Sequence, residues 1–164
     1  MVLRVYNVIS VFTHWICPLD GCSSPGVYDL GLIIDGSVSE GNYDVTQTKL
    51  FLLKLINQFH VSSRATHIGA IVYSDKPELI CTFAESRYYV PMSLKLRILG
   101  LEFPDGNTRT DRALKMAGRD LYSDRGGDRT GVPNVLVVIT DDNTDHGSEP
   151  YKDVLKPLKV QSLT

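Results

Sequence analysis

The sequence predicts an α/β fold: a Rossmann-like, doubly wound sheet of mainly parallel strands with one antiparallel strand at its edge. Two observations lead to this prediction. Short, uniformly apolar runs at 30–34 and 135–139 suit strands that are buried on both faces of a parallel sheet. Segments with helical periodicity separate these runs from other strand-like segments, and such alternation is typical of a sheet covered by helices.

The first half of the chain contains a helix and two further strands. Asn42 or Ser39 can cap a helix that runs to about residue 59. A second strand is expected at 67–74 and a third at 78–83. Because the link between these two is short, we expect a hairpin, which makes the third strand an antiparallel edge strand.

The second half carries three candidate helices around the strongest strand, 135–139. Ser93 can cap the first of them, and Thr110 or Asp111 the second, which we expect to end near Tyr122. The loop 123–133 is rich in Gly, Asp and Arg and should be solvated. The last helical candidate covers 149–158.

Composition limits the function without naming it. A chain of 164 residues fits one domain with a sizeable core. A net charge of −2 argues against nucleic acid or an anionic membrane as a partner. The hydrophobic content of 43% is that of a folded domain. No apolar run approaches the roughly 20 residues that span a bilayer.

The first 27 residues form a separate N-terminal extension in this interpretation. Residues 1–16 only loosely resemble a signal peptide, because polar side chains interrupt the apolar stretch, so a poorly ordered extension is the alternative. Cys17 and Cys22 lie in this segment, where a local or intermolecular disulfide is an option. Cys81 lies within a strand and is most simply a small buried side chain.

A candidate metal site begins directly after the strand 30–34. Asp35, Ser37 and Ser39 place one carboxylate and two hydroxyls at the strand's carboxyl end. Open α/β sheets bind their ligands at that edge. Oxygen ligands of this kind suit a hard cation such as Mg²⁺. Asp-Gly-Ser is also an ordinary turn sequence, so these residues alone do not decide.

Two further residues join this site. Asp141 follows the strand 135–139 as Asp35 follows the first strand, and Thr108 lies in a polar loop that leads into a helix. Two carboxylates at one sheet edge repel each other unless a cation or proton intervenes. Asp35, Ser37, Ser39, Thr108 and Asp141 then supply five oxygen ligands or supporting groups. Neutral hydroxyls would leave the cation electrophilic and open to an acidic group of a partner.

These motifs resemble the von Willebrand factor A domain family, of the integrin I-domain type. The likeness lies in Asp35-Gly36-Ser37-Val38-Ser39, Gly106-Asn107-Thr108-Arg109-Thr110 and Val135-Leu136-Val137-Val138-Ile139-Thr140-Asp141, and it extends from Tyr28 to about Leu158. The resemblance implies that Ser37, Ser39 and Thr108 contact Mg²⁺ through their hydroxyls. Asp35 and Asp141 would bind directly or through water, and an acidic ligand residue would complete the octahedron.

The same resemblance implies a context and a partner. Such domains are commonly adhesive modules of extracellular matrix proteins, including matrilin-like and collagen-VI-like chains. We therefore expect a secreted, non-enzymatic module that binds collagen or another adhesion protein, with Mn²⁺ or Ca²⁺ as alternatives to Mg²⁺. We expect no nucleic-acid partner and no membrane span.

The chain departs from the family pattern in two ways. Asp142 stands where the family usually has Gly, which can shift the metal preference or block an acidic partner. The domain 28–164 also lacks the family's last strand-helix-strand portion, which predicts C-terminal truncation. Without those elements, we expect the apolar strand 135–139 to be left unpaired near an edge of the sheet.

Two other functions remain open. The first is an intracellular scaffold with the same fold. The second is a Mg²⁺-dependent phosphoryl-transfer enzyme with Asp35 as the nucleophile, although such chemistry wants a second acid where Ser37 stands. The four histidines share no metal-ligand spacing and are expected to serve in packing or at the surface: His14, His60, His67 and His146.

Overall fold

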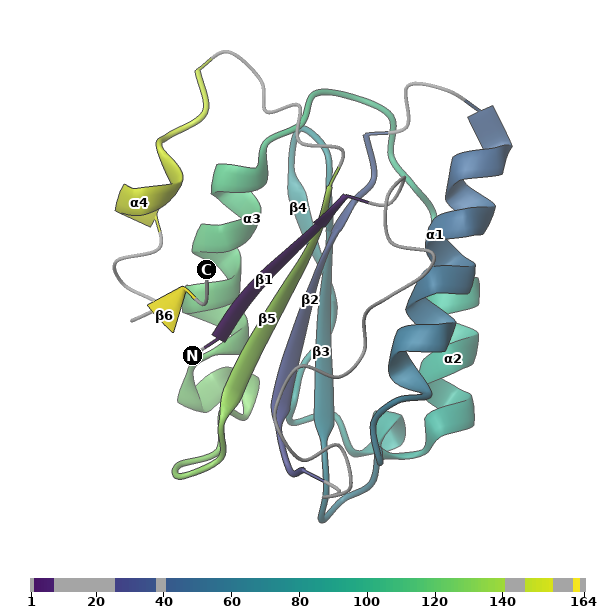
Figure 1. The fold of residues 1–164 in the computed structure, drawn as a ribbon, viewed down its shortest axis with the longest axis vertical. Helices are drawn as coiled ribbons and strands as arrows, with labels where there is room; N and C mark the ends of the chain where they lie inside the picture. The colour runs from purple at the N-terminus through teal and green to yellow at the C-terminus, as the bar shows by residue number, and fades with distance from the viewer. Residues whose placement is uncertain (1, 8–25, 38–40, 141–146, 155–160, 163–164) are drawn as a thin grey trace.

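The described residues form one six-stranded sheet with helices on both faces (Figure 1). The computed structural model describes residues 2–7, 26–37, 41–140, 147–154 and 161–162. The strands lie in the order β4-β3-β2-β5-β1-β6. Their bounds are β1 Val2–Asn7, β2 Asp29–Asp35, β3 His67–Tyr73, β4 Pro77–Cys81, β5 Asn134–Thr140 and β6 Gln161–Ser162.

In the part of the chain that the structure describes, two helices lie on each side of the sheet. In Figure 1, α1 and α2 lie on the right of the sheet, while α3 and α4 lie on its left. The bounds of these helices are α1 Gly41–Ile56, α2 Pro91–Leu99, α3 Thr110–Met116 and α4 Tyr151–Val154. The shorter helical segments are η1 Ser86–Tyr89, η2 Ala117–Leu121 and η3 Asp124–Gly126. This arrangement confirms the predicted doubly wound fold.

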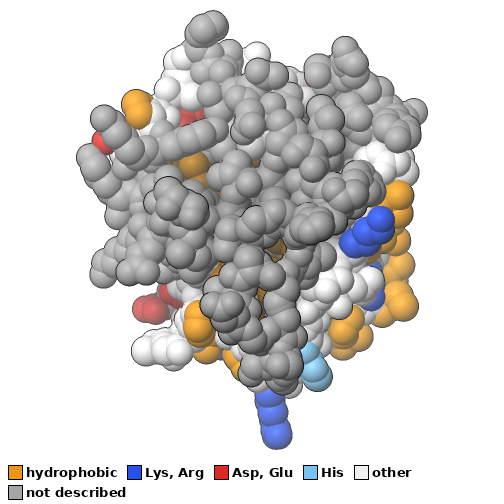
Figure 2. Space-filling view, viewed as in Figure 1, with side chains coloured by type: hydrophobic (Ala, Val, Ile, Leu, Met, Phe, Trp, Pro, Cys, Tyr) orange, Lys and Arg blue, Asp and Glu red, His pale blue; other side chains and the backbone are white. Residues whose placement is uncertain are grey.

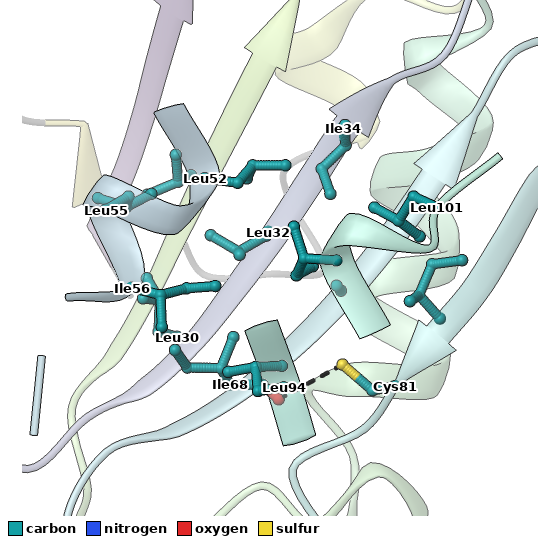
Figure 3. Close-up of a cluster of buried hydrophobic side chains, with 14 of the residues drawn as sticks. Leu30, Leu32, Ile34, Leu52, Leu55, Ile56, Ile68, Cys81, Leu94 and Leu101 are labelled. Carbon is teal, nitrogen blue, oxygen red and sulfur yellow. Dashed lines mark hydrogen bonds between the residues drawn. The ribbon is translucent and has the colours of Figure 1, made fainter. Parts of the chain in front are cut away.

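The alternation of side chains along the strands divides the core into two layers. Leu30, Leu32 and Ile34 of β2 point toward α1 and α2, where they pack against Leu52, Ile56 and Leu94 (Figure 3). Cys81 belongs to the same layer and, as predicted, is a small buried side chain with a free thiol. It donates a hydrogen bond to the Ile68 carbonyl at 3.7 Å. Burial raises the pKa of this thiol to about 12.

The opposite layer lies beneath α3. Ile33 of β2 joins Ile71 and Tyr73 of β3, and all three are fully buried. Leu114 and Leu121 cover them from α3 and η2. Side chains at odd positions of β2 therefore face α3, and this parity decides where Asp35 points.

The sheet is parallel except at β4. β2 pairs in parallel with β3 and with β5, whereas β3 and β4 are antiparallel. The predicted antiparallel edge strand is thus confirmed. The short segment between β3 and β4 leaves room only for a hairpin.

The strand β5 differs from the sequence prediction. It is paired on both sides, with β2 on one and with β1 on the other, and Val2 to Asn7 match Val135 to Thr140 in register. The expectation of an unpaired strand 135–139 is therefore wrong. The prediction had treated the first 27 residues as outside the sheet, whereas Val2–Asn7 form a strand within it.

Two helices begin at residues other than those predicted. α2 starts at Pro91, two residues before Ser93, because the fixed φ of proline suits the first helical position. α3 starts at Thr110, and its N-cap is Arg109, which makes no side-chain capping bond. Thr110 and Asp111 lie inside this helix and use their side chains for other contacts. Neither helix therefore has the predicted cap.

A buried ion pair fixes the amino-terminal end of β2. Asp29 is fully buried and accepts hydrogen bonds from the Arg129 backbone N–H and Nε, each at 2.8 Å. The same guanidinium donates to the carbonyls of Ala65 and Tyr28, both at 2.9 Å. Arg129 thereby ties the loop before β5 to the starts of β2 and β3.

One flank of the molecule exposes apolar side chains. Met92, Leu96 and Leu99 of α2 are 63%, 61% and 47% exposed, while Leu94 and Ile98 on the opposite side of the helix are buried. Figure 2 shows hydrophobic side chains along the right edge, where Figure 1 draws α1 and α2. Among the described residues, no helix has the length and apolarity that a membrane crossing requires.

Candidate metal centre

Three neighbouring strands end together at the upper edge of the sheet in Figure 1. Asp35 ends β2, Tyr73 ends β3 and Thr140 ends β5. Asp35 and Tyr73 are register partners, and Ile34 pairs with Ile139 one residue earlier. Their side chains lie on the α3 side of the sheet, above the layer that contains Ile33 and Ile71.

The Asp35 carboxylate is surrounded by donors. Its Oδ1 accepts hydrogen bonds from the Ser37 backbone N–H at 3.0 Å and from the Ser37 hydroxyl. Its Oδ2 accepts from the Tyr73 hydroxyl and from the Thr140 hydroxyl, both at 3.1 Å. Four donated bonds therefore fix the carboxylate in position.

Ser37 links Asp35 to the loop that carries Thr108. The Ser37 Oγ lies 2.7 Å from the Thr108 Oγ1. Since the single hydroxyl proton of Ser37 goes to Asp35, Thr108 is the donor in this contact. Two hydroxyl oxygens that are 71 residues apart in sequence thus meet beside a carboxylate.

The Thr108 loop is held against the end of β3. The Arg109 backbone N–H donates to the Ser74 carbonyl at 3.2 Å. Asn107 donates through its side-chain amide to the Asp75 Oδ1 at 2.8 Å. Gly106 has a φ of +142°, and a Cβ there would lie 2.6 Å from the Asp75 Oδ2. Glycine is favoured here because other residues rarely adopt this φ.

An ion pair between Arg109 and Asp111, which follow Thr108 in sequence, stabilises the start of α3. Arg109 donates to both carboxylate oxygens of Asp111, through Nε at 2.9 Å and through an Nη at 2.8 Å. These bonds lower the pKa of the buried Asp111 carboxyl. Asp111 therefore stays ionised beneath the loop, and Arg109 is directed toward it.

Burial dominates the electrostatics of the site. It raises the pKa of the Asp35 carboxyl, and the bonds from Ser37, Thr140 and Tyr73 only partly oppose that shift. It also raises the pKa of the Tyr73 phenol, to which the neighbouring Asp35 contributes. Tyr73 therefore keeps its proton and acts as a donor at neutral pH.

The structure brings together three of the five predicted site residues. Asp35, Ser37 and Thr108 are in contact as described above. Ser39 and Asp141 lie outside the described residues, as does Asp142. Cys17 and Cys22 also lie outside that part of the chain. The two bonds from Ser37 to Asp35 direct the Ser37 hydroxyl at the site.

The observed geometry fits a divalent cation. In an octahedral Mg²⁺ site with oxygens at 2.0–2.1 Å, adjacent ligands are about 2.9 Å apart. The 2.7 Å separation between the Ser37 and Thr108 hydroxyl oxygens is close to that spacing. Within the described residues, no group of three or more His, Cys, Asp or Glu side chains is placed for a metal. Hydroxyl oxygens are therefore the main donors that this part of the chain offers.

Sequence reasoning missed the residues that support Asp35. Tyr73 was assigned only to a strand, and Thr110 only to a helix cap, yet their oxygens lie 2.8 Å apart next to Asp35. Thr140 had been placed beside Asp141 without a role. The available signal was that all three residues end or begin an element at the same sheet edge as Asp35.

The comparison with protein families agrees with this geometry. The model of the von Willebrand factor type A domain matches residues 29–164 of the chain. The chain belongs to the von Willebrand factor type A domain family. The match covers the sheet from β2 onward, together with the Asp35 and Thr108 loops, so the predicted family is confirmed.

The curated relatives that this chain matches are longer proteins. The chain is 29% identical over 140 residues to "von Willebrand factor A domain-containing protein 2" of Xenopus laevis, covering 84% of this chain and 17% of that protein. It is 30% identical over 155 residues to the collagen alpha-6(VI) chain of Mus musculus, covering 90% of this chain and 6% of that one. The chain thus spans less than a fifth of either relative.

A mussel byssus protein shares the fold. Proximal thread matrix protein 1 superposes with a TM-score of 0.74 at 17% identity, over 84% of this chain and 37% of that one. A second structure of that protein, with a TM-score of 0.70 at 16% identity over the same shares, is described as having a zinc-occupied MIDAS motif, the metal-ion-dependent adhesion site. At this identity the likeness establishes the fold alone.

Proposed function

We propose that this chain is a non-enzymatic adhesion module whose site holds a divalent cation, with Mg²⁺ as the favoured ion and Mn²⁺ or Ca²⁺ as alternatives. Ser37, Ser39 and Thr108 would supply hydroxyl ligands, while Asp35 and Asp141 would bind directly or through water. The observation that carries this proposal is the contact of Ser37 with both Asp35 and Thr108 at the carboxyl edge of the sheet. Bound there, a cation would attract an acidic side chain of a protein partner.

The proposed partner is an extracellular matrix protein such as collagen, and the proposed location is outside the cell. Collagen VI chains are among the relatives, and this supports a matrix setting. The division of the chain into an extension, 1–27, and a domain, 28–164, also stays a prediction. β1 lies in the same sheet as the rest, so any such division cuts through one sheet.

Calorimetric titration of the full chain with Mg²⁺, Mn²⁺ and Zn²⁺ tests the cation site. Ser37→Ala and Thr108→Ala should each abolish or strongly weaken the binding heat, because each removes a hydroxyl ligand. Ser93→Ala is the matched control, since Ser93 lies on α2 outside the site. Absence of binding heat at millimolar metal in the unmodified chain would refute the cation site.

A solid-phase assay tests the adhesive step separately. The chain should bind immobilised collagen in the presence of Mg²⁺ and lose that binding in EDTA. Ser37→Ala should behave in Mg²⁺ as the unmodified chain does in EDTA. Collagen binding that persists equally in EDTA and in the variant would mean that the cation does not mediate adhesion.

The phosphoryl-transfer alternative has weaker support. Both Asp35 oxygens already accept two hydrogen bonds each, and such a carboxylate is a poor nucleophile. Ser37 also stands where a second acid would be needed. Hydrolysis of p-nitrophenyl phosphate in Mg²⁺ that disappears in Asp35→Asn would favour this enzyme over an adhesion module. The alternative of an intracellular scaffold differs from the proposed adhesion module in cellular location alone.

A further inference from the structure

Tyr73 places a hydroxyl between Asp35 and Thr110 at the candidate site. It is fully buried at the end of β3, and its ring packs in the layer beneath α3. Its hydroxyl lies 3.1 Å from the Asp35 Oδ2 and 2.8 Å from the Thr110 Oγ1. Asp35 is the last residue of β2 and Thr110 the first residue of α3, so one hydroxyl joins two elements.

The direction of these bonds follows from their chemistry. An ionised carboxylate only accepts, and a phenol has one proton to donate, so Tyr73 donates to Asp35. The Thr110 hydroxyl, whose contact with Tyr73 could run either way, must then donate to the Tyr73 oxygen. The result is a series of hydrogen bonds in one direction: Thr110 donates to Tyr73, and Tyr73 donates to Asp35.

These hydrogen bonds lie next to two of the three proposed hydroxyl ligands. Ser37 lies two residues after Asp35, and Thr108 lies two residues before Thr110. The spacing between the Ser37 and Thr108 hydroxyls therefore depends on how β2 and α3 sit relative to each other. Besides the direct contact between those hydroxyls, the Tyr73 hydroxyl is a side-chain link that fixes this relation on the buried side of the site.

The Tyr73 hydroxyl is not required for packing. A phenylalanine would fill the same volume against the same apolar neighbours. Burying a phenol is favourable only when its hydroxyl is satisfied, and here Asp35 and Thr110 of the site are among its partners. We therefore infer that Tyr73 is a positioning residue, whose hydroxyl holds Asp35 and the start of α3 so that Ser37 and Thr108 keep the spacing of a divalent-cation site. This inference rests on the proposed cation site and adds a residue that acts on it without touching the cation.

Tyr73→Phe tests the inference, with Tyr122→Phe as a matched control. Tyr122 loses the same atom from the same layer, but its hydroxyl serves the backbone away from the site: it donates to the Val135 carbonyl at 2.6 Å and accepts from the Gly31 N–H at 3.0 Å. Calorimetric titration with Mn²⁺ and Mg²⁺ should show about 10-fold weaker binding for Tyr73→Phe, in the range seen when a group supporting a metal ligand is lost. Tyr122→Phe should bind as the unmodified chain does, even where its melting temperature falls.

A metal-free readout separates this inference from the proposed function. Hydrogen–deuterium exchange of 106–112 without metal should be faster in Tyr73→Phe than in the unmodified chain, and unchanged in Tyr122→Phe. If the unmodified chain binds no cation but this difference appears, the proposed function fails and the positioning role stands. Equal exchange in all three proteins would overturn the positioning role, as would equal cation affinity in a folded Tyr73→Phe.

Thr110→Val provides a second variant if Tyr73→Phe fails to fold. It removes the hydroxyl that donates to Tyr73 while leaving the Tyr73 bond to Asp35 in place. Its cation affinity should fall in the same direction but by less, and 106–112 should again exchange faster. A Thr110→Val variant that matches the unmodified chain in both measurements would show that the link to α3 has no positioning effect.

Discussion

The Asp29–Arg129 pair allows a sharp test of how the fold is held at the end opposite the candidate site. Asp29 is fully buried at the start of β2, whereas 24% of the Arg129 side chain is exposed. Removing one partner of a buried pair costs about 3–5 kcal/mol, because the remaining charge stays buried without compensation. Since the Arg129 side chain is partly solvated, we expect Asp29→Asn to cost about 3 kcal/mol, near the lower end.

Arg129→Met should be the more damaging of the two changes. It leaves the Asp29 carboxylate buried and also removes the bonds to the Ala65 and Tyr28 carbonyls, each of which contributes about 1 kcal/mol. A total near 4–5 kcal/mol would unfold a marginal domain at moderate temperature. For a chain of this size, 1 kcal/mol corresponds to about 2–4 °C in melting temperature, so Asp29→Asn alone should lower it by roughly 6–12 °C.

Thermal and urea denaturation of the two single variants and the double variant measure the coupling. The double variant should be less destabilised than the sum of the single variants by about 2 kcal/mol, because neither charge is left alone. Arg119→Met is the control: Arg119 pairs with Asp120 at the surface, and its loss should leave the melting temperature unchanged. Strictly additive free energies would refute the interpretation of Asp29 and Arg129 as a coupled pair, and a changed cation affinity in Asp29→Asn would refute its separation from the site.

Three further predictions concern other parts of the chain. Leu94→Ala should cost about 2–5 kcal/mol in urea denaturation because Leu94 is fully buried, whereas Leu96→Ala on the same helix should cost well under 1 kcal/mol. His67 has a pKa held below 6.5 by burial and by the nearby Arg129, so the stability it contributes is present above pH 6.5 and declines as the pH falls below that value; His67→Phe should flatten the dependence of melting temperature on pH in this range. Deleting residues 1–7 should expose the edge of β5, lower the melting temperature and cause concentration-dependent association in size-exclusion chromatography.

The central strands and the site loop were predictable because their signals are local. A run of apolar residues that ends in Asp35 or before Thr140 indicates a buried parallel strand and places polar groups at its carboxyl end. The hairpin between β3 and β4 was equally local, since the length of the link decides the strand direction. These features required no knowledge of distant contacts.

The features that sequence reasoning missed depend on tertiary contacts. Thr110 has the residue type of an N-cap, but Tyr73 offers its hydroxyl a partner inside the fold, and the helix begins at Thr110 itself. Val2–Asn7 falls within a stretch that loosely resembles a signal peptide, so its own pattern does not identify it as a strand. Its place follows from β5, which has an open edge that a parallel strand can fill.

The carboxylates at the two ends of β2 have different electrostatic surroundings. At the amino end, Asp29 meets a guanidinium, so that carboxylate is compensated within the chain. At the carboxyl end, the partners of Asp35 among the described residues are neutral hydroxyls and a backbone N–H, and burial raises its pKa. An ionised carboxylate there is less stable than in water, and a cation beside Ser37 and Thr108 would reverse that cost. A ligand that binds only the folded state stabilises it. A cation bound beside Asp35 would therefore stabilise the carboxyl end of β2, as Arg129 stabilises Asp29 at the amino end.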